Sequence, residues 1–233
     1  MSEMPGRALK MARLKRGWSQ TEAAARLGVS QAYLAMLESG KRRLPPRLAR
    51  QAMRLYGLPP TVLPPSGSVA KRTANAETLA KQLAALGYPG FAYLRLQGVP
   101  RKNPGEVLLT ALAQEDLEPR VVEALPWLLL QYWELDRAWL AREAKLRDLQ
   151  NRLGFVGGLA RRLAERAGNE KMVRALSELE AELDRSRLAR EDTLCRSSMP
   201  ERERQWLREY RPREARHWNL LTDWRPEVLP YAA

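Results

Sequence analysis

Histidine and cysteine, which commonly carry out catalysis or hold metal ions, are scarce in this sequence of 233 residues. His217 is its only histidine and Cys195 its only cysteine, and the two lie 22 positions apart. A zinc site needs several His or Cys ligands, and a nucleophilic cysteine needs a base beside it. The sequence also lacks a glycine-rich loop followed by Lys and Ser or Thr, which excludes a P-loop. We therefore expect no enzyme activity, no metal site and no cofactor.

Chemistry of another kind is concentrated near the N-terminus. Gln20 and Gln31 carry amides that both donate and accept hydrogen bonds, and Lys41, Arg42 and Arg43 form a basic run. Residues 1–60 contain twelve Lys and Arg against three acids, a net charge of +9, whereas residues 106–233 carry −1 of the chain's total of +13. This asymmetry predicts a polyanionic partner such as nucleic acid for the N-terminal part.

Capping serines, glycines and prolines in this segment predict five short helices within residues 1–62. Ser19 with Glu22 forms a capping-box pattern at the start of the second helix, and Ser30 caps the third. Gly28 lies between these two helices and can take the left-handed conformation of a tight turn. The remaining helices are expected over about residues 5–16, after Pro45 and Pro46, and after residues 57–60.

Two helices joined by so short a turn can place the second helix in the major groove of DNA. Leu34 and Leu37 are expected to point inward along the third helix. That leaves Gln31, Ala32, Tyr33, Ala35 and Met36 on or near its outer face.

Residues 7–58 resemble the phage-repressor and Cro helix-turn-helix family, also called the XRE type. The strings that carry the resemblance are RLKRGWSQTEAA (13–24) and LGVSQAYLAMLESG (27–40), so it covers the N-terminal quarter only. It implies a five-helix, lambda-repressor-like domain that binds double-stranded DNA with sequence specificity. Many members carry a polar residue where this chain has Ala32 or Met36, so its direct base readout is expected to be sparser or more apolar.

The resemblance also implies individual roles. Gln20 matches a residue that anchors a phosphate and braces a base-reading glutamine, which Gln31 matches. Arg13 and Glu38 match an internal salt bridge that ties the first helix to the third. The positions it implies for DNA contact are Gln20, Ser30, Gln31, Ala32, Tyr33, Met36, Lys41, Arg42 and Arg43.

The rest of the chain is mainly helical in pattern. We predict a Pro-, Ser- and Gly-rich linker at 63–75, a helical dimerisation or partner domain at 76–193, and a C-terminal segment with spaced Pro and Trp at 194–233. Within it, residues 91–96 alternate weakly, as a short strand would.

An apolar stripe on 4-3 spacing runs from Leu135 through Leu146 to Leu163, and a second from Met172 to Leu183, on either side of residues 167–169. Together they predict a helical hairpin. Gly154, Gly157 and Gly158 would mark either the close approach of another helix or a break. The C-terminal aromatic residues are expected to pack on the chain's own helices, with a role in clasping a partner as the alternative.

These features favour a cytoplasmic transcriptional regulator, a repressor that acts as a homodimer, with no membrane segment. The alternative is an antitoxin that represses its own operon and neutralises a toxin through its C-terminal region. An enzyme with a DNA-binding appendage is the weakest hypothesis.

Overall fold

The computed structural model describes residues 4–65, 74–96 and 98–231, which fall into two compact units. The first comprises the described residues up to 65 together with Arg101–Pro104, and the second comprises the remainder. Most of the predicted linker, residues 66–73, lies outside the described residues. The predicted domain at 76–193 and the predicted segment at 194–233 both lie within the second unit, apart from residues 101–104.

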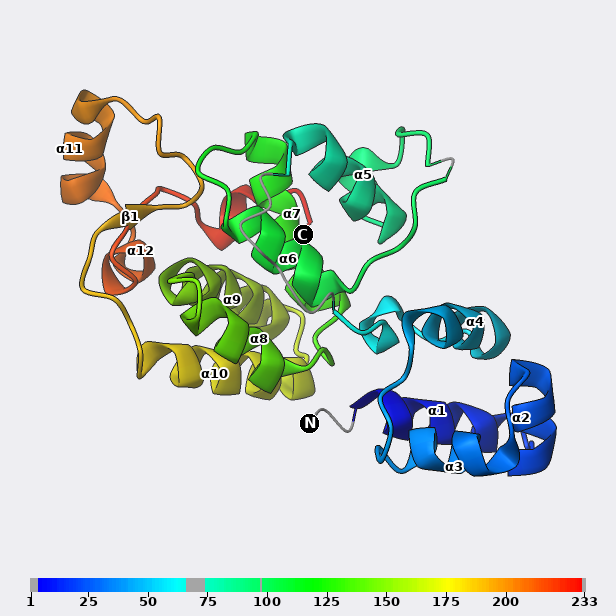
Figure 1. The fold of residues 1–233 in the computed structure, drawn as a ribbon. Coiled ribbons are helices and arrows are strands. Elements are labelled where there is room, and N and C mark those ends of the chain that lie inside the picture. The colour runs from blue at the N-terminus through cyan, green and yellow to red at the C-terminus, as the bar shows by residue number, and fades with distance from the viewer. Residues whose placement is uncertain (1–3, 66–73, 97, 232–233) are drawn as a thin grey trace. The chain divides into compact units, whose positions relative to one another are not determined.

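Four α-helices and one 3-10 turn make up the first unit (Figure 1). They are α1 (Met4–Lys15), α2 (Gln20–Leu27), α3 (Gln31–Glu38), α4 (Pro46–Tyr56) and the 3-10 turn η1 (Pro60–Val62). Their apolar sides meet in one core that includes Leu9, Leu27, Leu34, Leu37 and Ala49. Residues 101–104 also belong to this unit, and the side-chain amide of Asn103 donates to the carbonyls of Thr61 and Leu63.

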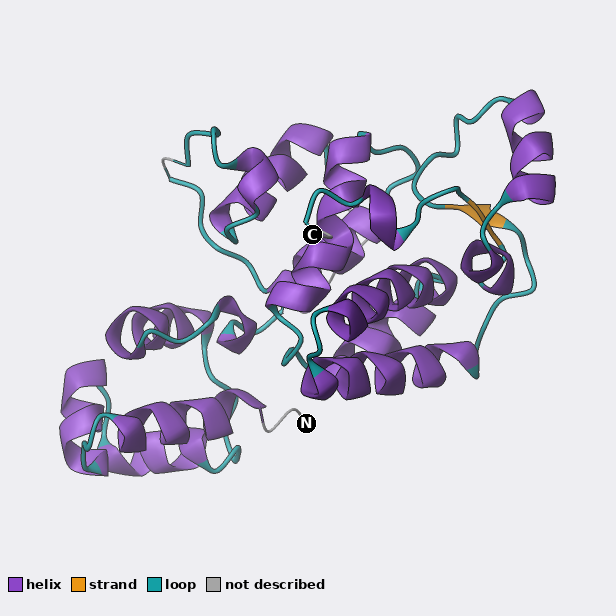
Figure 2. Cartoon of the chain, turned by 180° about the vertical axis from the view of Figure 1, so that it is seen from behind, coloured by secondary structure: helices purple, strands orange, loops and turns teal. Residues whose placement is uncertain are grey.

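Helices also dominate the second unit (Figure 2). They are α5 (Ala76–Ala85), α6 (Pro104–Leu112), α7 (Pro119–Gln131), α8 (Arg137–Lys145), α9 (Gln150–Arg166), α10 (Glu170–Asp184), α11 (Glu201–Tyr210) and α12 (Arg213–His217). Two 3-10 turns, η2 (Pro89–Phe91) and η3 (Pro226–Val228), and two short parallel strands, β1 (Asp192–Thr193) and β2 (Leu220–Leu221), complete it.

The predicted helical hairpin is confirmed: α9 and α10 pack along their lengths and are joined at residues 167–169. The first stripe, however, does not follow one helix. The chain breaks between α8 and α9, where Asp148 has a φ of 56°, and Leu146 at this break is 72% exposed. The apolar spacing continues across the turn between α8 and α9, so the spacing alone does not indicate that turn.

Two further expectations are corrected in this unit. Residues 91–96 form no strand; Pro89–Phe91 is a 3-10 turn, and Phe91 packs edge-on against Tyr88 in the core. At Gly154, the close approach comes from a side chain and not from another helix. The Trp218 ring lies so near that an added Cβ would be 2.3 Å from it.

The C-terminal aromatic residues divide between core and surface. Trp218 is buried, Trp224 and Tyr231 pack partly buried against the core, and Trp206 is 51% exposed. The Tyr231 hydroxyl accepts from the Trp127 N–H and donates to the Glu123 carbonyl. In a regular helix that N–H and that carbonyl would bond each other, and Pro126 disturbs α7 at this turn. Tyr231 therefore ties the C-terminal end of the chain to the turn of α7 that contains Pro126.

Candidate nucleic-acid interface

The turn between α2 and α3 is fixed by caps at both helices. Ser19 Oγ accepts from the Glu22 N–H at 3.1 Å, and Ser30 Oγ accepts from the Tyr33 N–H at 3.2 Å. Gly28 has a φ of 66°, a conformation that a residue with a Cβ adopts at a cost. In a complete capping box the Glu22 carboxylate would also accept from the Ser19 N–H. Here that carboxylate pairs with Arg26 instead, at 3.0 Å.

Helix α3 separates its side chains as its sequence predicts. Leu34 and Leu37 are buried between the helices. Gln31 and Ala32 are exposed, and Tyr33 and Met36 are half-buried beside them. The small, buried Ala24 lets α2 approach α3 closely, so this outer face is presented by a well-packed pair of helices.

A buried ion pair lies beneath this face. Arg13 on α1 donates through Nε to Glu38 Oε1 at 2.6 Å and through Nη2 to Glu38 Oε2 at 2.9 Å, and its Nη1 donates to the Trp18 carbonyl. Burial alone would raise the pKa of Glu38, but hydrogen bonds from Arg13 and Gln20 outweigh it and hold the pKa below its usual value. Glu38 is therefore an ionised acceptor at neutral pH.

A chain of hydrogen bonds leads from this pair to the surface. Gln20 Nε2 donates to Glu38 Oε2 at 3.0 Å, and Gln31 Nε2 donates to Gln20 Oε1 at 2.9 Å. We call Arg13, Glu38, Gln20 and Gln31 the glutamine relay. Because a carboxylate can only accept, Gln20 must turn its amide nitrogen inward and its oxygen toward Gln31. Among the described residues, the Gln31 amide bonds only to Gln20, which leaves its oxygen and one N–H available at the exposed start of α3.

That free amide edge has a definite recognition chemistry. One acceptor and one donor side by side match the N6 donor and N7 acceptor of adenine in the major groove. Ala32, next along α3, offers only a methyl group, which suits contact with a thymine methyl. The exposed start of α3 is thus polar at one position and apolar at the next.

Basic side chains follow α3 directly. Lys41, Arg42 and Arg43 are all exposed, and the Arg42 N–H donates to the Met36 carbonyl at 3.1 Å, which folds the loop back on the helix. The Arg42 guanidinium lies 5.9 Å from the centre of the Tyr33 ring. The structure therefore brings these two predicted residues together.

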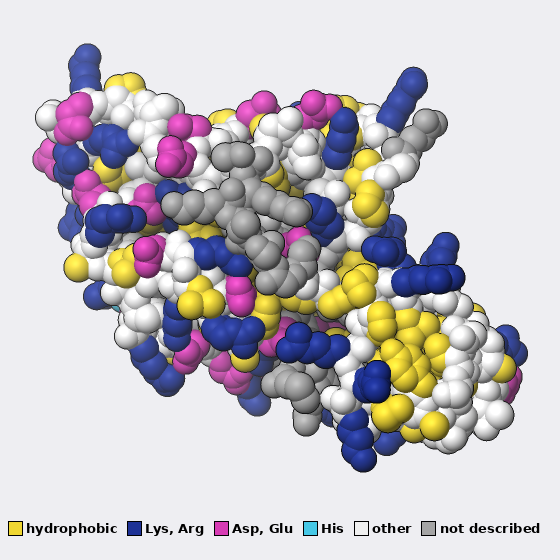
Figure 3. All heavy atoms as spheres, in the orientation of Figure 1, with side chains coloured by type: hydrophobic (Ala, Val, Ile, Leu, Met, Phe, Trp, Pro, Cys, Tyr) yellow, Lys and Arg dark blue, Asp and Glu magenta, His cyan; other side chains and the backbone are white. Residues whose placement is uncertain are grey.

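Sequence reasoning missed two features of this unit. Trp18 packs against Tyr56, and the Arg26 guanidinium lies 4.2 Å from the centre of the Trp18 ring. No local sequence pattern indicates these contacts. The exposed residues Arg47, Arg50 and Arg54 share one face of α4, and their 3- and 4-residue spacing would have indicated this. Figure 3 shows Lys and Arg side chains spread over the first unit and acidic side chains mixed with basic ones over the second.

Cys195 and His217, the two residues considered for catalysis, lie in the second unit, outside the helix-turn-helix unit. Cys195 is buried, and its burial raises the pKa of the thiol to about 11, so it stays protonated. His217 is exposed and lies 2.9 Å from Asp184. Among the described residues, no group of three His, Cys, Asp or Glu is arranged to hold a metal ion. Nor does any described helix have the length and apolar character needed to cross a membrane.

Comparison with known proteins gives one match. Residues 9–63 match the family model described as Helix-turn-helix. No curated protein and no solved structure matches the chain. The matched segment spans α2, α3, α4 and η1 and most of α1, including every member of the glutamine relay.

Proposed function

Since residues 9–63 are a helix-turn-helix domain, whose function is to bind DNA, we propose that α3 enters the major groove and that the protein is a sequence-specific transcriptional repressor. The observation that carries this proposal is the glutamine relay. It holds the Gln31 amide in one orientation at the exposed start of α3, so less side-chain freedom is lost when a base is bound.

The remaining predicted contacts take roles that fit their positions. Gln20 and the exposed start of α3 at Ser30 lie where a phosphate can be bound, and Ala32 meets a thymine methyl. Tyr33 and Met36 border the groove. Lys41, Arg42 and Arg43 are exposed cations that neutralise phosphates, and such contacts position a protein without reading sequence.

Two variants separate base reading from backbone binding. Gln31→Ala should lower the preference for operator over scrambled DNA by about 1–3 kcal/mol, the range of one bidentate base contact. Arg42→Ala should weaken binding to both DNAs alike and reduce the salt dependence by about one counterion. Binding titrations on both duplexes at several salt concentrations measure this. Equal loss of preference from both substitutions would contradict the assignment.

The protein is further proposed to act as a homodimer. Two helix-turn-helix domains read two half-sites about one helical turn apart, which a dimer makes possible. The near-neutral, Leu- and Trp-rich residues beyond 105 are the proposed contact region. Sedimentation equilibrium of the full chain and of residues 1–104 tests this: the full chain should be dimeric and the fragment monomeric, and a dimeric fragment would contradict it.

The antitoxin hypothesis uses the same DNA interface and adds a toxin bound by the second unit. A small toxin-like reading frame in the same operon would favour it over a simple repressor.

A further inference from the structure

Helix α11 carries two aromatic rings on its outer side, at an outer edge of the second unit in Figures 1 and 2. Trp206 and Tyr210 are 51% and 55% exposed, and their ring centres lie 5.4 Å apart. Their four-residue spacing makes them neighbours on one helix face. Single apolar side chains on a surface are ordinary, whereas adjoining ones favour an interaction site.

The opposite side of α11 attaches the helix to the rest of the unit. Leu207 is buried in a small core with Met199 and with Leu221 of β2. Arg208 pairs with Glu191, in the segment before β1, at 3.0 Å. The two exposed rings therefore project from a helix that is packed on its other side.

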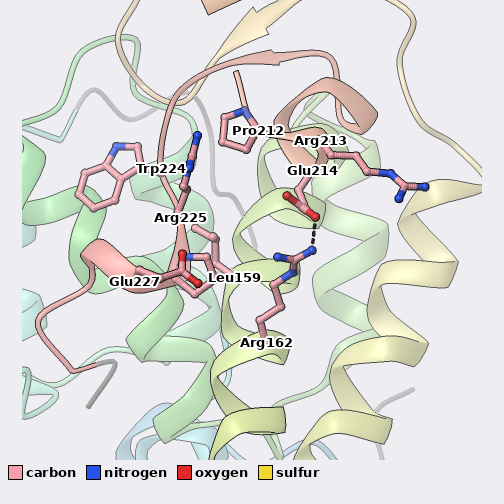
Figure 4. Close-up of a pocket in the computed structure, with 10 residues that line it drawn as sticks. Leu159, Arg162, Pro212, Arg213, Glu214, Trp224, Arg225 and Glu227 are labelled. Carbon is pink, nitrogen blue, oxygen red and sulfur yellow. Dashed lines mark hydrogen bonds and ion pairs between the residues drawn. The ribbon is translucent and has the colours of Figure 1, made fainter. Parts of the chain in front are cut away.

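The next helix holds the end of α11 in place. Only residues 211 and 212 separate α11 from α12. Figure 4 shows Arg162 on α9 paired with Glu214 on α12. Because α11 is already ordered by these contacts, little further ordering is needed when a partner binds to its outer face.

Charged side chains on α11 divide into two groups. Glu203 pairs with Arg196 at 2.5 Å, and Arg204 donates to the carbonyl of Ser197. Arg202 and Glu209 are exposed, and their side chains have no hydrogen-bond or ion-pair partner among the described residues. The outer face of α11 therefore has one unpaired cation near its start and one unpaired anion near its end.

The order of these groups makes the outer face complementary to itself. Arg202 and Glu209 are seven positions apart, so both lie on the side of the helix that carries Trp206. A second copy of α11 lying antiparallel on this face would place Arg202 opposite Glu209 of the second copy, at both ends, with Trp206 near the crossing point. A parallel copy would oppose like charges.

The symmetry and the charge balance both favour a second copy as the partner. A two-fold axis perpendicular to α11 produces the antiparallel arrangement and closes the assembly at two copies. The unpaired charges of Arg202 and Glu209 cancel, so this face offers no net attraction to a polyanion such as DNA.

We propose that α11 packs antiparallel against α11 of a second copy, with Trp206 at the centre of the contact. This inference rests on the proposed homodimer, to which it assigns a surface, and not on base reading by α3. A helix of 10 residues covers a small area. Interfaces below about 1,200 Å² are typical of weak association, so we expect a dissociation constant on the order of 10 μM.

Sedimentation equilibrium of the full-length protein without DNA tests the proposal. Trp206→Ala should weaken dimerisation at least about tenfold, because aromatic residues at the centre of an interface carry much of the binding energy. Tyr93→Ala removes a ring that is 67% exposed outside α11. It is the matched control and should leave the dissociation constant unchanged. Circular dichroism should show the same helix content in both variants, because both rings are exposed.

Charge reversal tests the antiparallel orientation. Arg202→Glu alone, or Glu209→Arg alone, would oppose like charges at two symmetric contacts and should weaken dimerisation by about three- to tenfold. The two substitutions together bring opposite charges face to face again and should restore dimerisation.

The outcomes distinguish the surface from the dimer. An unchanged dissociation constant in Trp206→Ala, or no rescue by the double reversal, would overturn the α11 contact but not the homodimer. A full-length protein that is monomeric at every concentration would overturn both. DNA binding is measured separately, by titration of Gln31→Ala, and neither result alters it.

Discussion

Each of the two units contains a buried arginine that holds a carboxylate through Nε and one terminal nitrogen, and the surroundings of the two pairs differ. In the first unit, Glu38 also accepts from Gln20, and the chain of hydrogen bonds continues to Gln31 at the surface. In the second unit, Arg152 donates to the Asp192 carboxylate through Nε at 2.7 Å and through Nη2 at 2.8 Å. Its Nη1 donates to the backbone carbonyls of Leu112 and Gln114.

The difference shows that one kind of ion pair, a buried arginine with a carboxylate, can serve two purposes. The Arg152 pair joins α9, the end of α6 and β1 and ends inside the unit, so we expect it to contribute to stability and not to orient a surface side chain. The Arg13 pair joins α1 to α3 and also orients a surface amide. Variants of the two pairs should therefore differ in what they do to DNA binding.

Arg152→Ala should give the largest loss of stability. It leaves the Asp192 carboxylate and the carbonyls of Leu112 and Gln114 without their donor, and breaking a buried pair costs about 3–5 kcal/mol. Urea unfolding followed by circular dichroism measures the change, with Arg174→Ala, at an exposed position on α10, as the control. DNA affinity of the folded protein should stay unchanged, and a loss of affinity without unfolding would break the comparison.

Glu38→Gln should act on both stability and DNA binding. The amide replaces a charged acceptor that holds Arg13 and Gln20, and hydrogen bonds to charged groups contribute about 1.5–3 kcal/mol. Its amide nitrogen also opposes the inward nitrogen of Gln20, which disturbs the orientation of Gln31. We expect a destabilised first unit together with a reduced preference for operator DNA. Unfolding and binding titrations on one preparation would test this, and a change in stability with unchanged sequence preference would show that Glu38 does not orient Gln31.

Tyr231→Phe should have the smallest effect on stability, about 1–2 kcal/mol, because it leaves one N–H and one carbonyl of α7 without the bridging hydroxyl. Amide hydrogen exchange should rise locally at Trp127. Tyr210→Phe, at an exposed position, is the control. Unchanged exchange at Trp127 would show that the bridge contributes nothing.

The local parts of this architecture could be predicted from the sequence, because they depend on neighbours a few residues apart. Ser19, Ser30 and Gly28 specify caps and a turn, and the spacing of leucines specifies the α9–α10 hairpin. The family resemblance implied that Gln20 braces Gln31 and that Arg13 pairs with Glu38, and both contacts are present; the hydrogen bond from Gln20 to Glu38 that links them was not anticipated.

What could not be predicted depends on partners distant in the chain. Nothing local to Gly154 indicates that the Trp218 ring will cover it, and Arg152 meets an aspartate forty residues away. Leu146 fits the apolar spacing, yet it is exposed in the turn between α8 and α9. Periodicity does not indicate a turn when the apolar spacing is the same on both sides of it.

Selection of bound duplexes from a randomised pool tests the central claim most directly, with the full-length protein and its Gln31→Ala variant compared at the same salt concentration. We predict that the protein enriches one motif and that the variant loses preference for an adenine at one position in each half-site, keeping the remainder. Recovery of no common motif by the unaltered protein, or of the same motif with the same adenine by both proteins, would contradict the account.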